Sequence, residues 1–162
     1  RTAEQDNLEK KKAIIEKLNK INQEESPSEK NGNIIRELMK EWNSIGHVPF
    51  KDKDKIYKQY RSLVDNLFDK LNLSASKKKL SNFKSNISKE TNLYREREKL
   101  VRAYENMKNE IKTYENNIGF LTSSSKKGNS LVIEMNRKIE KLKADLELIT
   151  QKIAVIDESI KE

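Results

Sequence analysis

The feature of this 162-residue sequence that most constrains its fold is a heptad repeat that runs along two consecutive stretches of its second half. In each stretch apolar residues recur in alternating steps of four and three, which places them on one side of an α-helix. The repeat predicts two helices that pack along a narrow apolar seam, as in a coiled coil. The seam positions are Leu93, Arg97, Leu100, Tyr104, Met107, Ile111, Tyr114, Ile118 and Leu121, followed by Val132, Met135, Ile139, Leu142, Leu146, Ile149, Ile153, Ile156 and Ile160.

The two stretches share one register. If the chain folds back between them, the residue numbers of facing seam positions must have a constant sum, and each pair adds to 253, as Ile111 does with Leu142. We therefore predict an antiparallel coiled-coil hairpin over residues 93–162, with a polar tip loop at 122–130. Arg97, opposite Ile156, is the one charged residue expected in the seam.

The composition extends the helical prediction to the whole chain. Only two prolines and four glycines interrupt it, while 34% of the residues are hydrophobic and 37% are charged. This is too little apolar material for a compact α/β enzyme and too much periodic apolar material for a disordered chain. We expect an elongated, all-α protein. No apolar run approaches the roughly 20 residues of a membrane span, so no membrane is expected as a partner.

The first part of the chain predicts a small three-helix module over residues 1–72. A first amphipathic helix is expected at 6–22. Ser26, Pro27 and Glu29 then form a capping box that is expected to begin a second helix, and Gly46 is expected to end it. A third helix follows from about residue 52.

The apolar positions of these three helices can share one core. Trp42 is expected at its centre, against Tyr60 or its neighbours on the third helix, rather than on the surface as a platform for base stacking. Tyr57 is the aromatic residue expected to be more exposed. Residues 72–76 are polar and are expected to bend the chain, after which a helix runs without interruption to residue 118. Its first part, 73–92, would connect the module to the hairpin.

Part of the chain resembles a known family. The pattern consists of Leu38, Trp42, Ile45, Gly46, Val48, Pro49, Tyr57, Tyr60, Arg61, Asp65 and Phe68. It is similar to that of a bacterial family of three-helix modules catalogued as domain of unknown function 349, often found as tandem repeats. The resemblance covers about residues 6–72 and implies a three-helix fold and a bacterial origin. It implies no activity and no site residue, because the family has no agreed activity.

Charge gives the sharper functional signal, since 34 Lys and Arg against 26 Asp and Glu make a net charge of +8. On a continuous helix from residue 77, one face would carry cations and no acid over roughly 38 Å. A face of this kind suits contacts with nucleic-acid phosphates. Its cations are Lys77, Lys84, Arg95, Lys99 and Arg102, and the expected hairpin tip adds Lys126 and Lys127.

No catalytic, cofactor-binding or metal-binding pattern occurs in the sequence. His47 is the only histidine and there is no cysteine, so no cofactor is expected. We expect a non-enzymatic helical scaffold or adaptor that binds protein partners, as part of a longer multi-repeat bacterial protein in the cytoplasm. The alternative is a nucleic-acid- or ribosome-associated protein that binds the phosphate backbone of RNA or DNA through the basic face.

Overall fold

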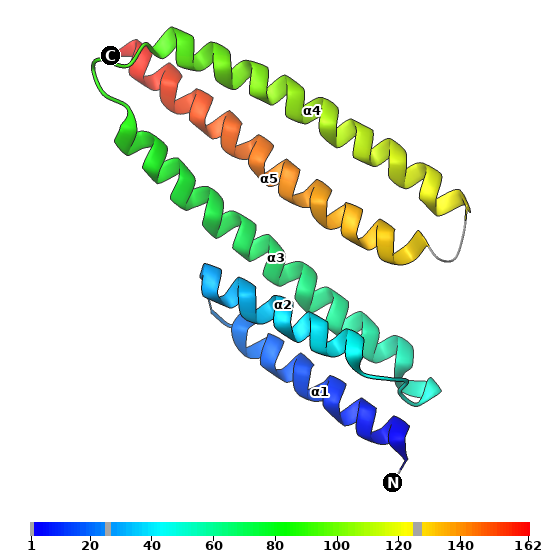
Figure 1. Cartoon of the computed structure of the whole chain (residues 1–162). Coiled ribbons are helices and arrows are strands. Elements are labelled where there is room, and N and C mark those ends of the chain that lie inside the picture. Colours follow the sequence, from blue (N-terminus) through cyan, green and yellow to red (C-terminus); the bar gives the residue numbers. More distant parts are fainter. Residues whose placement is uncertain (1, 25–26, 125–127) are drawn as a thin grey trace. The chain divides into compact units, whose positions relative to one another are not determined.

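The computed structural model describes residues 2–24, 27–124 and 128–162, and within these ranges it contains five helices and no strand (Figure 1). The prediction of an all-α fold is confirmed. The chain divides into two compact units, Arg1–Ser74 and Ala75–Glu162. The helices are α1 (Ala3–Asn22), α2 (Glu29–Ser44), α3 (Phe50–Asn86), α4 (Leu93–Ser124) and α5 (Gly128–Lys161).

The first unit has a core built from α1, α2 and the first part of α3. Leu18, Ile35 and Val64, one from each helix, are fully buried. Trp42 is only 4% exposed, and its ring stacks on that of Tyr60 with the centroids 3.9 Å apart and the planes 5° from parallel. The prediction that Trp42 belongs to the core and not to an exposed stacking platform is therefore confirmed.

A lysine completes this aromatic stack. The Lys11 ammonium lies 4.6 Å from the centroid of the Trp42 ring. Because the parallel Tyr60 ring fills one face of the indole, the ammonium lies against the other face, where a cation is attracted to the π-system. Partial burial and the nearby charge of Lys53 lower the pKa of Lys11.

The beginning of α2 differs from the expectation. The N-cap is Ser28, whose backbone N–H and hydroxyl both donate to Asn31 Oδ1, at 2.8 and 2.9 Å. Pro27 precedes the helix and is buried instead of occupying its first turn. The expected N-cap, Ser26, lies outside the described residues. The sequence prediction favoured an N3 glutamate, whereas asparagine provides the reciprocal bond here.

The end of α2 depends on a close approach rather than on left-handed backbone. Ile45 takes up an extended conformation after Ser44, and none of the described glycines has a positive φ. A Cβ atom added to Gly46 would lie 3.1 Å from Asn7 Nδ2, which donates to the His47 carbonyl oxygen at 2.8 Å. The glycine thus makes room for a side chain of α1 that ties down the α2–α3 turn.

The course of α3 corrects the prediction for the middle of the chain. The expected bend at 72–76 is absent, and this stretch continues the helix. The chain instead leaves the helix at 87–92, so a single helix from 77 to 118 was wrong. There Ser88 N–H donates to Thr91 Oγ1 at 3.1 Å, and Asn92 Oδ1 accepts from the N–H of Arg95 at 3.2 Å. These side chains satisfy backbone groups that a continuous helix would have paired.

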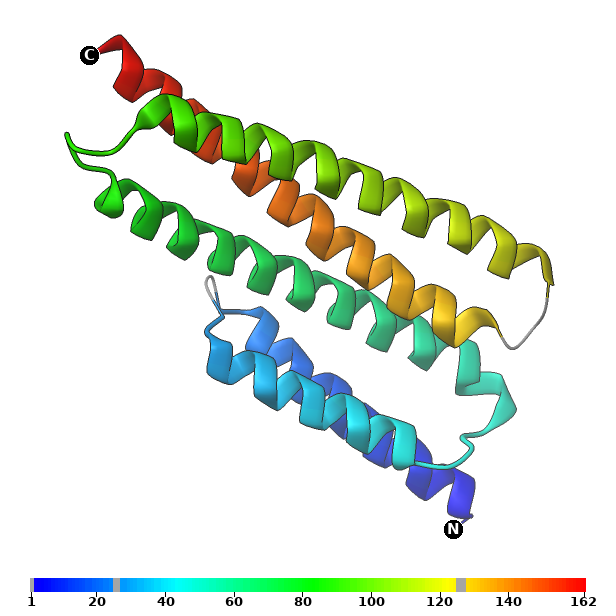
Figure 2. The same ribbon diagram turned by 45° about the horizontal axis from the view of Figure 1, so that its top comes forward.

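The second unit contains the hairpin of α4 and α5, which run antiparallel and side by side in both views (Figures 1 and 2). Ile111, Ile139 and Leu142 form its buried centre, with Met107, Tyr114, Ile118 and Leu146 packed around them. These residues include three pairs of the predicted register, and the antiparallel hairpin is confirmed. The helices extend to Ser124 and from Gly128, so most of the tip loop expected at 122–130 is helical.

A second apolar side of α5 was not predicted. Leu148 is buried although it lies outside the seam. Four residues later, Lys152 Nζ lies 5.3 Å from the ring centroid of Phe83, on the last part of α3. Leu80, Phe83 and Ile87 are all partly buried in this unit. α5 therefore has neighbours on two sides.

None of the helices, as far as the chain is described, combines the length and the apolar character needed to cross a membrane.

The first prediction compares two glycines of the first unit. A Cβ atom at Gly32, inside α2, would make ordinary contacts with Arg36 and Leu71 at 3.4 Å and beyond. Gly32→Ala should therefore stabilise the unit by up to about 1 kcal/mol through helix propensity. Gly46→Ala should destabilise it, because the new methyl group displaces Asn7 from its hydrogen bond. Chemical unfolding monitored by the fluorescence of Trp42 measures both, and the same sign for both would contradict this account.

The second prediction concerns the hairpin. Leu142→Asp should unfold α4 and α5, since an unpaired carboxylate in an apolar seam costs several kcal/mol. Far-ultraviolet circular dichroism should show the loss of helix. Lys143→Asp, at the exposed neighbouring position, is the control and should keep the helical signal. Equal signals from the two variants would refute the predicted seam.

Candidate functional site

The residues of the predicted basic face lie on two helices. Lys77 and Lys84 belong to α3, whereas Arg95, Lys99 and Arg102 belong to α4. The geometry of one straight face was wrong, because the chain turns at 87–92 between the two groups. All five side chains are exposed. Lys126 and Lys127, expected at the hairpin tip, lie outside the described residues.

The α4 part of the face remains continuous. At 100° per residue, one group of side chains between residues 95 and 113 falls within about 40° of Arg95, on the side of α4 that points away from the seam. Every member of the group is exposed, and none is acidic. The nearest acids, Glu98 and Glu110, lie about 60° around the helix on either side. We call this group the α4 outer surface; it consists of Arg95, Lys99, Arg102, Asn106, Asn109 and Thr113.

The cations of the α4 outer surface are mostly unneutralised. Lys99 Nζ lies 3.6 Å from Glu96 Oε1, a long and exposed pair. Arg95 and Arg102 form no ion pair with the residues that the structure describes. Solvent-exposed arginines of this kind retain five donors each for an anion, and phosphate or carboxylate oxygens fit the fork of the guanidinium.

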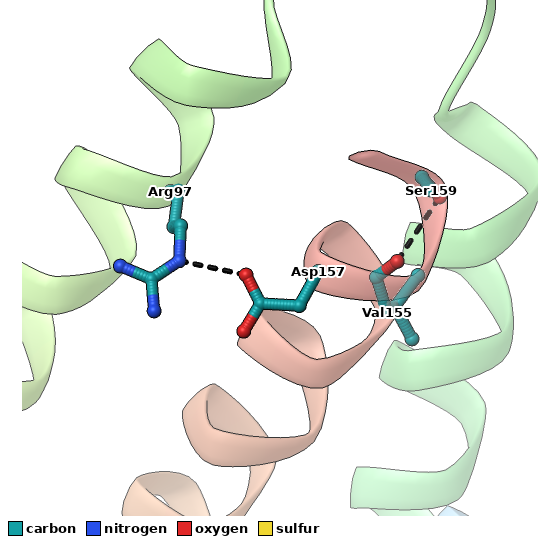
Figure 3. A network of polar contacts seen from close by, with 4 residues as sticks. All are labelled: Arg97, Val155, Asp157 and Ser159. Carbon is teal, nitrogen blue, oxygen red and sulfur yellow. Dashed lines mark hydrogen bonds and ion pairs between the residues drawn. The ribbon is translucent and has the colours of Figure 1, made fainter. Parts of the chain in front are cut away.

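The expected charged residue of the seam has a partner that sequence reasoning missed. Arg97 Nε donates to Asp157 Oδ1 at 2.7 Å, and Figure 3 shows the two side chains meeting between α4 and α5. Two residues further along α5, Ser159 Oγ donates to the Val155 carbonyl oxygen at 3.0 Å. The hydrogen bond to Asp157 raises the pKa of Arg97. The signal was present in the sequence, since the acid lies next to Ile156, the position assigned opposite Arg97.

The surroundings of His47 do not indicate a catalytic or metal site. Its side chain is exposed, and it is its backbone carbonyl that accepts the bond from Asn7. Across residues 2–24, 27–124 and 128–162, no group of three or more His, Cys, Asp or Glu side chains is placed to hold a metal ion. Arg61 and Asp65 form an i,i+4 ion pair on α3, with Nε and Oδ2 3.3 Å apart.

Several aromatic side chains on the outer sides of the helices are exposed to solvent. Phe50, at the start of α3, is 89% exposed, and Tyr57 shares its side of the helix two turns later with 43% exposure. Tyr94 and Phe120, near the two ends of α4, are 70% and 76% exposed. Only Tyr57 was expected on the surface. The others were missed because exposure depends on which side of a helix finds a neighbour, and periodicity alone does not report this.

Comparison with known proteins gives one match. No curated protein and no solved structure matches the chain. The family described as Domain of Unknown Function (DUF349) has a model that matches residues 1–51. The matched range contains the Leu38, Trp42 and Pro49 part of the pattern, and the aromatic residues of α3 lie beyond it. The resemblance to this family inferred from the sequence is thus confirmed over residues 1–51.

Proposed function

We propose that the chain is a non-catalytic helical scaffold or adaptor, part of a longer multi-repeat bacterial protein, whose outer helix sides bind protein partners. The observation that carries the proposal is the exposure of large aromatic side chains, Phe50 above all. Aromatic residues are enriched where proteins meet, because they bury much apolar area in few rotatable bonds. Phe50 and Tyr57 lie two turns apart, a spacing that lets one partner cover both.

Removing these two aromatic side chains tests the proposal. A tagged chain should capture a defined set of proteins from an extract of its source cell, and nuclease treatment should not change that set. The double variant Phe50→Ser/Tyr57→Ser should lose at least one of these proteins, because the partner loses its apolar anchors. Leu73→Ser, at another exposed apolar position of α3, is the control and should keep all of them. Capture that is unchanged in the double variant would refute a partner site at Phe50.

A second candidate function is nucleic-acid binding through the α4 outer surface. It is favoured by the three exposed cations, of which only Lys99 pairs with an acid among the described residues, and by the net charge of +8. Each phosphate that a cation neutralises releases a counterion, which gives sequence-independent affinity. The amide side chains of Asn106 and Asn109 continue the surface with further hydrogen-bond donors.

Salt dependence tests this second function. Fluorescence anisotropy with unrelated RNA and DNA oligonucleotides should give a log affinity that falls with log salt concentration, by about 0.7 to 0.9 per contact. Changing Arg95, Lys99 and Arg102 together to Gln should weaken binding to all sequences alike and reduce the slope by about two to three. Lys77→Gln/Lys84→Gln is the control on α3 and should leave the slope closer to that of the parent. Equal binding by the parent and the triple variant would exclude the α4 outer surface.

A further inference from the structure

A second side of the hairpin has the opposite charge. Between residues 140 and 158 of α5, a group of residues falls within about 40° of Glu140, away from both the seam and Leu148. Its members are exposed except for the half-buried Ala144, and none of them is basic. Glu158 Oε1 lies 3.5 Å from Lys161 Nζ, and the two form an exposed ion pair. We call this group the α5 acidic surface; it consists of Glu140, Ala144, Glu147, Gln151, Ala154 and Glu158.

The two surfaces carry opposite charges, and their charged residues have the same spacing. Arg95 and Arg102 are seven residues apart, as are Glu140 and Glu147. Seven residues are two turns, so each pair spans about 10.5 Å along its helix. Two such helices laid side by side bring both arginines to both glutamates. Ala144 and Ala154 leave room for the neighbouring helix to approach, because they carry only a methyl group.

We propose that the α4 outer surface of one copy of this chain binds the α5 acidic surface of a second copy. The proposal rests on the scaffold function proposed above, and it names a second copy of the chain as one of the scaffold's protein partners. The contact is heterologous, since two different surfaces meet. A pair of copies leaves one surface of each sign unoccupied, one on each copy, and further copies can bind there.

The association is expected to be weak and to depend on the few ion pairs between the two surfaces. Exposed ion pairs each contribute little, and the net charge of +8 makes whole copies repel one another. Salt weakens both effects, so a salt titration alone would be ambiguous. Charge reversal separates them, because it changes the local pairing and the net charge in known directions.

The test is sedimentation velocity of the full chain at low salt and at increasing concentration. The wild type should sediment faster as its concentration rises. Arg95→Glu/Arg102→Glu should remain a monomer, although it lowers the net charge to about +4 and so reduces overall repulsion. Glu140→Lys/Glu147→Lys should also remain a monomer. An equimolar mixture of these two variants should associate again, because each then offers the surface that the other lacks.

A matched control removes the effect of net charge for the α4 variant. Lys77→Glu/Lys84→Glu makes the same change in net charge on α3 and should associate as the wild type does. Circular dichroism should show that all variants keep their helix. A wild type that is monomeric at every concentration, a mixture that fails to associate, or a control that dissociates as the α4 variant does would each overturn the proposal.

The same variants separate this proposal from the two proposed functions. Glu140→Lys/Glu147→Lys should abolish self-association and leave oligonucleotide binding intact or stronger. Capture of other proteins through Phe50 should be unaffected by either charge reversal. Failure of self-association alone therefore leaves the scaffold function standing, whereas unchanged protein capture by Phe50→Ser/Tyr57→Ser would count only against the partner site at Phe50.

Discussion

The burial of narrow apolar stripes holds each part of this structure together. With 37% charged and 34% hydrophobic residues, no helix has enough apolar surface to be enclosed on all sides. Each helix therefore buries only a few of its side chains, such as Val64 in the first unit or Ile156 in the second, both fully buried. Full burial of such a side chain contributes about 1.5–3 kcal/mol. Exposed pairs such as Lys141 with Asp145, at 3.3 Å, contribute far less.

The sequence allowed the parts of the fold that depend on this burial to be predicted. The α4–α5 register followed from the spacing of apolar residues, and Ile111, Ile139 and Leu142 indeed form one cluster. Trp42 was placed in the core by its helical spacing with leucine and isoleucine neighbours. These predictions succeed because burial imposes a period, and a period is visible in one dimension.

The ends of the helices could not be predicted in the same way. Residues 72–76 and 87–92 are both polar and contain no glycine or proline, yet only the second stretch interrupts the helix. The difference lies in side-chain hydrogen bonds, such as that from Ser88 N–H to Thr91 Oγ1, which compete with the helix only when the tertiary structure favours a turn. The candidate basic face depended on helix continuity across this stretch and was divided for that reason.

Some of the exposed charges do not stabilise the helix that carries them. Arg95 and Lys99 lie four residues apart on the side of α4 away from the seam, and like charges at this spacing destabilise an isolated helix by a few tenths of a kcal/mol. The pair of Lys99 with Glu96, at 3.6 Å, relieves this only in part. An anionic partner reverses the sign of the interaction, because each cation then gains a counter-charge. Nucleic-acid phosphates and the glutamates of a second copy are the two proposed sources of that charge. The glutamates differ from phosphates in one respect: Glu140 and Glu147 have the same two-turn spacing as Arg95 and Arg102.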